Sequence, residues 1–547
     1  MSPSEPPSPP SGPPSGTPSD RPTEPPAERP VEPAIEPLTD PSGEPPPEPP
    51  TGAPTGFSAV KPSARPSATP SRARPGRSPH GRSPLGRSPH GVAGAPARTP
   101  ELDAGLPVLL LRTDRNPLHH GTLGAIRSLG RAGVPVHAVL EGPGAPAARS
   151  RHLHRRHPWG PSPHSHPEAL AEHLRVIAGR IGRPVLLLPL DDAGAIFIAE
   201  HAPALAECFV FTSCDPTGPR RVADKALLVE QCTRLGIACP ESAIPRSPAE
   251  VDAAVRRLGL PLVLKWPRPW LLPPGMRGTV VVRTAAEAHR LFALAATLGP
   301  PSGTPFAHAP TPARGGPAHR GTPGRGAVPE DAERPGPPIL QRHIPPEGGD
   351  WFFHGYFDDD GTCLFGATGR KHLAHPAEAG HTVSGEWVLN PELEHLAHKI
   401  VGMLGHRGTV DLDFRFDART GTYHLLDFNP RLGAQFRLFR DGSDLDLVRI
   451  AHLALSGRAV PPARPRYGRT LLVENHLLHR VVTRPGGRRA AVRRLREADE
   501  LAWFAADDPV PFLSMAGRSL SMAGRGLAAA GRGRGRGRGR SRRGTRG

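Results

Sequence analysis

Three side chains with hard oxygen atoms lie on two neighbouring apolar segments of the sequence. Asp413 belongs to VDLDFRF, and Asp427 and Asn429 belong to YHLLDFNPR. If the two segments pair as a hairpin, Asp427 and Asn429 share a face, because residues two apart on a strand point the same way. Asp413 can then lie opposite them. Two carboxylates and an amide oxygen suit Mg²⁺ (or Mn²⁺) bridging phosphate oxygens. The alternative is a solvated hairpin face, but the surrounding Leu and Phe residues indicate acids that need partners.

Two further residues lie beside this predicted metal site. Asp411 shares a face with Asp413, so it competes for the role of first ligand, and spacing does not choose between them. Arg431 follows Asn429 by two residues, where it can reach an anionic ligand.

Lysine is rare in this chain, which has five Lys against 64 Arg. A lysine in the folded part is therefore expected where a compact, flexible ammonium group is needed. Lys265 ends the apolar run PLVLK, and the loop after it contains Gly275, Arg277 and Gly278 before the chain returns into TVVVRT. Such a loop can fold over a phosphate chain, with the lysine as a point charge. The P-loop pattern G-x-x-x-x-G-K-[ST] is absent.

Short apolar segments alternate with helical segments in the first folded part. PVLLLRT (107–113), VPVHAVL (134–140) and PVLLLPL (184–190) are typical of buried strands, with helices between them. This alternation predicts βαβ units and a parallel sheet over about 105–220.

The pattern changes from Asp224 onward. WFFHGYFD and CLFGATGRK predict an antiparallel pair around Asp358–Gly361, and a helix over 391–404 leads to the acidic hairpin. Antiparallel hairpins beside helices indicate α+β layering, so the fold class expected is α/β followed by α+β. The stretch 458–515 adds short elements and a basic helix over 489–503.

Three stretches have a composition typical of disorder. Of the 74 prolines, 30 fall in the first hundred residues, so residues 1–104 form a Pro-rich region. A Pro- and Gly-rich insertion covers 299–337, and an Arg- and Gly-rich tail covers 516–547.

Charge, cysteine content and hydropathy limit the function classes. The net charge is +18, with eight Arg in the last 17 residues, so nucleic acid is expected as a partner only through that tail. Five Cys form no CxxC pair, which favours a reduced, cytoplasmic protein. There is no signal-peptide pattern and no apolar run near the length of a membrane span, so we expect a soluble protein.

The order of the parts resembles the ATP-grasp superfamily of carboxylate–amine and carboxylate–thiol ligases. The βαβ domain is followed by DK on a helix, VLK, a loop, VVVRT, LQRHIPPEGGD, GRK, DLDF and LDFNPR. Over about 105–457 the chain is most similar to the bacterial carboxylate–amine ligases that include D-aspartate ligase. The resemblance implies an ATP-grasp fold with a pre-ATP-grasp domain (105–220), an ATP-grasp domain (221–457) and a C-terminal extension (458–515).

For the nucleotide, the resemblance implies that Lys225 and Lys265 contact the phosphates of ATP, with Lys265 also near the adenine. A backbone hinge would bind the adenine and one acid would contact the ribose; these residues are Gln341, Arg342, His343, Ile344 and Asp350.

For the reaction, the resemblance implies that Asp413, Asp427 and Asn429 hold Mg²⁺. Arg431, with Arg370 or Lys371, would face the transferred phosphate and the acyl phosphate.

Three features depart from the family pattern. The hinge reads Gln341-Arg342-His343 where the family often has Glu, Asp427 replaces the commoner Glu as a metal ligand, and the 266–279 loop is rich in Pro. The expected activity is still an ATP-dependent ligase: a small-molecule carboxylate attacks the γ-phosphate, and an amine then attacks the acyl phosphate. The 266–279 loop would be the lid that excludes water. Neither substrate nor the oligomeric state is identified by the sequence.

Two other function classes remain as alternatives: a non-catalytic nucleotide-binding or scaffold protein, and a nucleic-acid-associated protein acting through its tail.

Asp191 and Asp192 follow a parallel strand, where they either line the substrate side or cap a helix. Lys399 is expected on a solvated helix face. Five histidines offer a zinc site but lie in a Pro- and Arg-rich segment more typical of an exposed loop: His152, His154, His157, His164 and His166.

Overall fold

The computed structural model describes residues 99–298, 333–477 and 488–521, apart from Arg115, Ala377 and Ala379. Most of the three stretches with a composition typical of disorder therefore lies outside the described residues: 1–98, 299–332 and 522–547. Residues 510–521, which include the predicted start of the tail, are helical. Within the described part of the chain, every helix is too short or too polar to cross a bilayer.

The first sheet is parallel, as the alternating pattern predicts. Its strand order is β3-β2-β1-β4-β5, and every neighbouring pair is parallel. The strands are β1 (Val108–Leu111), β2 (Val136–Leu140), β3 (Arg155–Pro158), β4 (Val185–Pro189) and β5 (Phe209–Val210). The helices are α1 (His120–Arg131), α2 (Pro167–Ile181), α3 (Asp192–Glu200), α4 (Ala202–Leu205) and α5 (Gly218–Ala223). Leu109, Leu111 and Leu187 pack against α2 and α3 in one core, as expected of strands buried on both faces.

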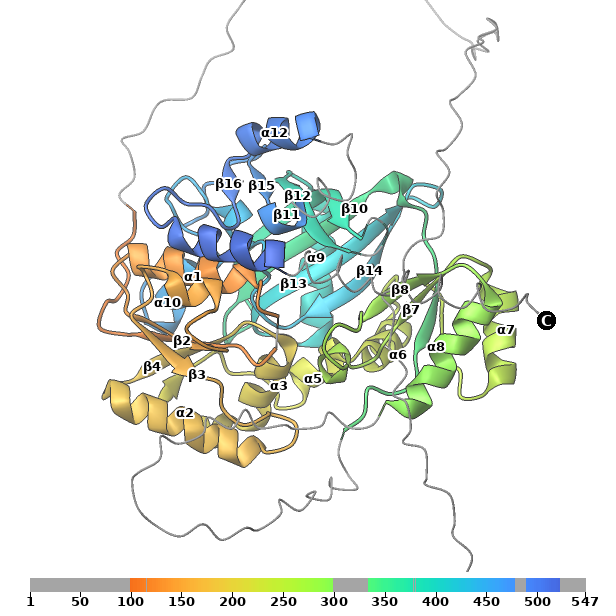
Figure 1. Ribbon diagram of the computed structural model, residues 1–547, viewed down its shortest axis with the longest axis horizontal. Coiled ribbons are helices and arrows are strands. Elements are labelled where there is room, and N and C mark those ends of the chain that lie inside the picture. The colour runs from red at the N-terminus through yellow and green to blue at the C-terminus, as the bar shows by residue number, and fades with distance from the viewer. Residues whose placement is uncertain are drawn as a thin grey trace, which may run out of the picture. The chain divides into compact units, whose positions relative to one another are not determined.

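A four-stranded antiparallel sheet follows, in the order β6-β9-β7-β8. Its elements are α6 (Lys225–Leu235), β6 (Ser242–Ala243), α7 (Pro248–Leu258), β7 (Leu262–Lys265), β8 (Thr279–Val282), α8 (Ala285–Thr297) and β9 (Ile339–Arg342). The helices α7 and α8 lie side by side along this sheet (Figure 1), and their apolar side chains share a core with Leu262, Leu264 and Trp266. The sheet therefore holds Lys265 at the end of a rigid strand.

The third sheet has seven strands, in the order β14-β13-β10-β11-β12-β15-β16, and is antiparallel except for the final pair. Its strands are β10 (Asp350–Phe357), β11 (Cys363–His375), β12 (His381–Trp387), β13 (Gly408–Asp417), β14 (Thr422–Asn429), β15 (Thr470–Leu472) and β16 (Glu500–Leu501). One face carries Phe353, Leu412 and Phe414 and packs on α9 (Pro391–Leu404). Both predicted hairpins are present here.

The opposite face of this sheet is divided in two. Phe352 and Tyr356 pack into a core that also contains residues of α1 and α10 (Leu447–Leu455), whereas charged residues occupy the neighbouring positions. The helical residues 510–521 lie beside α1 (Figure 1), and Met515 is buried in the same core. The basic helix of the extension is α12 (Arg488–Glu497), which ends before the predicted 503 because Glu500–Leu501 pairs with β15 as strand β16. A parallel sheet followed by two largely antiparallel sheets confirms the predicted fold class of α/β followed by α+β.

Candidate active site

The hairpin of β13 and β14 brings the predicted acids together in register. Asp413 lies opposite Asp427, and Asp411 lies opposite Asn429. Both pairs share one face of the sheet, because their positions on each strand differ by two. The register therefore pairs Asp413, rather than Asp411, with Asp427.

Lys225 and Lys265 both reach Asp427 from other elements. The Lys225 Nζ atom lies 3.1 Å from Asp427 Oδ1, and the Lys265 Nζ atom lies 3.0 Å from the same oxygen. Lys265 also donates a hydrogen bond of 2.6 Å to the Leu426 carbonyl. Both lysines are buried, so each ammonium group depends on these acceptors.

The local structure explains how Lys225 arrives there. Asp224 caps α6 by accepting hydrogen bonds from the backbone amides of Ala226 and Leu227, so Lys225 is the first residue of the helix. Its backbone amide donates to the Pro267 carbonyl at 2.9 Å, and Arg268 Nε lies 2.8 Å from Asp224. The start of α6 is thus tied to the loop after β7, which carries Lys265.

The two lysines decide the charge state of Asp427. Burial acts to raise the pKa of this carboxyl, but the nearby charges of Lys225 and Lys265 outweigh burial and hold the pKa at about 2. For Lys265, burial and the neighbouring Lys225 lower the pKa despite Asp427. For Lys225, the carboxylates of Asp427 and Asp192 overcome burial and raise the pKa. The cluster is a compact set of opposite charges held out of water.

The predicted alternatives Arg370 and Lys371 lie on opposite faces of β11. Lys371 Nζ lies 2.6 Å from Asp413 Oδ1, and this carboxylate raises the lysine's pKa against the effect of burial. The exposed Arg370 guanidinium lies over the ring of Trp351, 5.4 Å from its centroid. The structure therefore brings Lys371, and not Arg370, to the acidic cluster.

Arg431 joins the cluster to the first domain. Its Nη1 atom lies 2.5 Å from Asp411 Oδ2, and its Nε atom lies 3.5 Å from Asp192 Oδ1. Burial opposes the charge, but the carboxylates of Asp411 and Asp192 raise the pKa of Arg431 above its usual range. His354 Nε2 lies 3.2 Å from the other oxygen of Asp411. Asp411 is thus held by Arg431 and His354, and it lies opposite Asn429 rather than Asp427.

The remaining predicted ligand, Asn429, is buried. Its Nδ2 group donates to the Asp411 carbonyl at 3.0 Å, which leaves the amide oxygen for a cation. No group of three or more His, Cys, Asp and Glu side chains within the described ranges is placed to hold a metal ion. The predicted set has two carboxylates and one amide, and it fits Mg²⁺, which takes few protein ligands and completes its shell with water and phosphate oxygens.

The predicted hinge lies on and after β9. Gln341 is buried and donates to Ser242 Oγ at 3.0 Å, while the Arg342 guanidinium lies 2.6 Å from Glu241. Arg415 links the end of the hinge to the predicted ribose contact: it donates to the Ile344 carbonyl at 3.0 Å and lies 2.7 Å from Asp350.

Arg415 was missed as a site residue by the sequence analysis. The spacing could have identified it, because Arg415 follows Asp413 by two residues and so lies on the same face of β13. The sequence did not show that this face also carries Asp350 on the adjacent strand, directly opposite Arg415.

The loop that follows Lys265 depends on its two glycines. Gly275 has a φ of 89°, a conformation that favours glycine. A Cβ atom on Gly278 would lie 2.9 Å from the Pro269 side chain. The Gly278 carbonyl accepts a hydrogen bond of 3.0 Å from the Trp266 amide. The ends of the loop are thus held together next to Lys265.

Asp191 and Asp192 have different environments. Asp191 caps α3 by accepting from the Gly194 amide at 2.7 Å, and it also binds the Asp114 amide at 2.9 Å and the Thr113 hydroxyl at 3.0 Å. Asp192 instead lies near Arg431. The capping interpretation therefore fits Asp191, and the substrate-side interpretation fits Asp192.

The histidines proposed as an alternative zinc site are divided among different neighbours. The rings of His154 and His157 both lie beside His137, with centroids 5.0 and 5.3 Å from it. His157 Nε2 lies 3.0 Å from His137 Nδ1, whereas His152 pairs with Asp507 and His164 with Glu333. Lys399 is exposed on α9, as expected.

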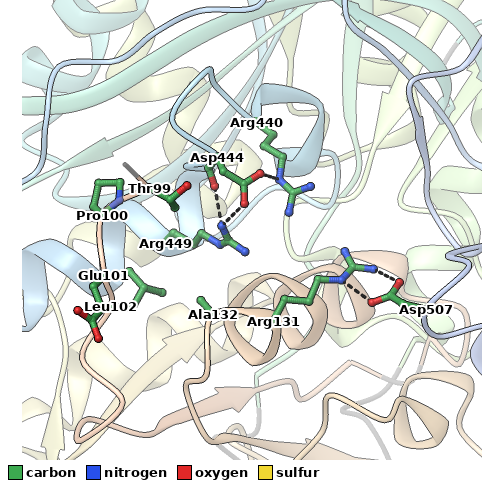
Figure 2. Close-up of a pocket in the computed structure, with 10 residues that line it drawn as sticks. All are labelled: Thr99, Pro100, Glu101, Leu102, Arg131, Ala132, Arg440, Asp444, Arg449 and Asp507. Atoms are coloured by element: carbon green, nitrogen blue, oxygen red, sulfur yellow. Dashed lines mark hydrogen bonds and ion pairs between the residues drawn. The ribbon is translucent and has the colours of Figure 1, made fainter. Parts of the chain in front are cut away.

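Figure 2 shows a separate cavity of about 680 Å³ that contains none of the predicted site residues. Its three arginines are paired with two aspartates of the same cavity. Arg131 lies 2.6 Å from Asp507, and Arg440 and Arg449 lie 3.0 and 2.6 Å from Asp444. The cavity lacks the lysines and the acids that the sequence singled out, and these lie together at the cluster on β13 and β14, which remains the candidate active site.

No protein-family model matches the chain, and no curated protein matches its sequence. Solved structures of low sequence identity are similar to part of the chain. The biotin carboxylase domain of the Hydrogenobacter thermophilus 2-oxoglutarate carboxylase is 16% identical over 66% of this chain and 72% of its own, with a TM-score of 0.45. The ADP complex of N5-carboxyaminoimidazole synthetase from Staphylococcus aureus is 10% identical over 68% and 82%, with a TM-score of 0.47. Likenesses of this degree assign no reaction, and the narrower resemblance to D-aspartate ligase finds no support in them.

Proposed function

We propose that the protein is an ATP- and Mg²⁺-dependent ligase that activates a carboxylate as an acyl phosphate and joins it to an amine. One observation carries the proposal: Lys225, Lys265 and Lys371 converge on Asp413 and Asp427 at one face of a sheet. Three buried or nearly buried ammonium groups beside two carboxylates provide both the cations that bind phosphate and the oxygens that bind Mg²⁺.

The nucleotide and the metal would use different parts of this cluster. Asp413, Asp427 and Asn429 would hold Mg²⁺, which when bound neutralises charge on the phosphate oxygens. Lys225 and Lys265 would bind the phosphates under the loop of Gly275 and Gly278. The hinge backbone would bind the adenine and Asp350 the ribose, with the residues Gln341, Arg342, His343 and Ile344 forming the hinge.

The chemistry follows from the need to bring two anions together. A carboxylate oxygen of the substrate attacks the γ-phosphorus of ATP, and the bond to the leaving ADP breaks. Lys371 and Arg431 would stabilise the negative charge that builds up on the transferred group. An amine then attacks the carbonyl carbon of the acyl phosphate, phosphate leaves, and one proton is released. Closure of the 266–279 loop would keep water from hydrolysing the acyl phosphate.

The test uses the full chain with Mg·ATP, hydroxylamine and a panel of amino acids and other carboxylic acids. ADP release and hydroxamate formation are followed together, because hydroxylamine traps an acyl phosphate. We expect both products with at least one acid, and their loss in Asp427→Ala but not in Lys399→Ala, which alters an exposed lysine. ATP binding without turnover on any acid would favour the non-catalytic alternative. Absence of ATP binding would overturn the metal and lysine assignments together.

A further inference from the structure

Asp192 lies beside the candidate active site and has no role in the reaction proposed above. It is the first residue of α3, just after β4 at the carboxyl end of the parallel sheet, which is where open α/β sheets bind ligands. Its side chain is 15% exposed and faces Arg431 on the ATP-grasp side. A carboxylate of the first domain therefore borders the site in which the acyl phosphate would form.

The hydrogen bonding of Asp192 differs from that of its neighbour. Asp191 accepts hydrogen bonds from the Thr113 amide and hydroxyl, the Asp114 amide and the Gly194 amide. The Oδ1 atom of Asp192 is buried and accepts no hydrogen bond from the described residues. Its distance of 3.5 Å from Arg431 Nε allows an ion-pair attraction but is too long for a good hydrogen bond. A buried carboxylate oxygen with spare acceptor capacity calls for a partner.

The other acids of the cluster already have partners. Asp427 is bound by two lysines, Asp413 by Lys371, and Asp411 by Arg431. Asp192 differs because its nearest cation, Arg431, gives its shorter contact to Asp411. A ligand with a positively charged hydrogen-bond donor would supply what Asp192 lacks.

Electrostatics make Asp192 a suitable proton acceptor. Burial raises the pKa of this carboxyl, while Arg431 and Lys225 act to lower it and the nearby Asp191 and Asp427 act to raise it. A carboxylate with a raised pKa is a stronger base than one exposed to water.

We propose that Asp192 binds the amine substrate in its ammonium form and takes up the proton that this amine must lose before it attacks. The inference rests on the proposed function. One N–H bond of the ammonium breaks and its proton moves to Asp192, so the nitrogen regains its lone pair. That lone pair forms the bond to the acyl carbon, and the bond from this carbon to the phosphate oxygen breaks. The nitrogen is positively charged once it has bonded to carbon, and it loses a second proton, which the departing phosphate carries away. Asp192 then returns the first proton to water. The substrate class is therefore a basic amine, bound on the side of the first domain.

The test compares two nucleophiles on Asp192→Asn in the full chain. Hydroxylamine is largely unprotonated near neutral pH and needs no base, whereas ammonium chloride and the amino acids present a protonated amine. With a carboxylate that the unaltered protein activates, we expect Asp192→Asn to lower the rate of amide formation at least about 100-fold. Hydroxamate formation and the ADP released with it should change by less than about threefold, since they lack the proton-transfer step. Asp192→Glu, which keeps the carboxylate, should restore part of the amide rate.

The two proposals fail in different ways. If the unaltered protein forms neither ADP nor hydroxamate, the proposed function falls and the role of Asp192 falls with it. If the unaltered protein is active but Asp192→Asn lowers hydroxamate and amide formation equally, Asp192 only positions Arg431 and the inference is overturned. An unchanged rate with both nucleophiles overturns it as well.

Discussion

Two clusters of buried charges in this molecule differ in how completely their atoms are bonded. In the first, Arg127 of α1 donates to Asp508 Oδ2 at 3.0 Å, to the Trp503 carbonyl at 2.9 Å and to the Asp508 carbonyl at 2.6 Å. Asp508 also accepts from the Ser150 hydroxyl at 2.6 Å and the Arg151 amide at 3.0 Å. All three guanidinium nitrogens and both carboxylate oxygens are used.

The second cluster, on β13 and β14, is bonded less completely. Lys225 and Lys265 share a single oxygen of Asp427, and Asp192 Oδ1 accepts no hydrogen bond from the described residues. Buried charged groups whose hydrogen-bonding capacity is fully used connect parts of a fold. Buried charged groups with unused hydrogen-bonding capacity are typical of a ligand-binding site. The first cluster therefore connects the C-terminal extension to the parallel-sheet domain, and the second is the candidate active site.

The largest effect is expected from breaking the first cluster. Arg127→Met should lower the free energy of unfolding by about 3–5 kcal/mol, because it leaves the buried Asp508 carboxylate without its cation and two buried carbonyls without their donor. Arg131→Met is the matched control on the same helix, since Arg131 pairs with the neighbouring Asp507 but both side chains are partly exposed. The control should cost at most about 1 kcal/mol. Urea unfolding measures both values, and equal costs would contradict the structural role assigned to the Arg127 cluster.

The same cluster contributes to the stability of the protein in acid. Burial acts to raise the pKa of Asp508, but the hydrogen bonds from Ser150, Arg151 and Arg127 outweigh it and lower the pKa below the ordinary value. A carboxyl with a lowered folded-state pKa contributes stability above its unfolded pKa of about 3.9 and loses it as the pH falls through the folded value. Arg127→Met should therefore unfold at a higher pH than the unaltered protein on acid titration.

A smaller free-energy change, expressed in activity rather than stability, is expected at the second cluster. Lys265→Met should lower ATP turnover about 100-fold, because one of the two cations that would bind and position the phosphates of ATP is lost. The free energy of unfolding should fall by about 1–2 kcal/mol, less than for Arg127→Met, since Lys225 still neutralises Asp427 and one carbonyl, that of Leu426, loses a donor. Lys399→Met, at an exposed lysine, should alter neither quantity. If Lys265→Met instead unfolded the protein while its folded fraction kept full turnover, the cluster on β13 and β14 would stabilise the fold and would not be the active site.

The parts of the fold and site that were predictable are those governed by local periodicity. Apolar alternation and the spacing of Asp427 and Asn429 predicted the acidic hairpin and its shared face, since strand geometry alone sets which residues point together. The parallel sheet followed from apolar runs between helices. These features need only neighbouring residues.

What could not be predicted depends on contacts between distant segments. Lys265 meets Asp427 across 162 residues, and Arg127 meets Asp508 across 381. Periodicity shows which face a side chain occupies, but it does not show which other face lies against it. For this reason the role of the C-terminal extension was missed, and Arg415 was not linked to Asp350.

The smallest effect separates two neighbours that the sequence left as alternatives. Arg370 and Lys371 lie on opposite faces of β11, the first over Trp351 and the second against Asp413. Arg370→Ala removes an exposed cation–π contact and should lower the free energy of unfolding by about 0.5–1 kcal/mol. ATP turnover should stay within about twofold, because none of the observed contacts of this side chain reaches the acidic cluster.

Lys371→Met, the adjacent substitution, should lower ATP turnover by at least about tenfold, since it removes the cation beside Asp413. Steady-state ADP release by the two variants decides the comparison. An equal loss of turnover in both variants would mean that cations on both faces of the sheet take part in the reaction. The site would then have to extend around the edge of β11.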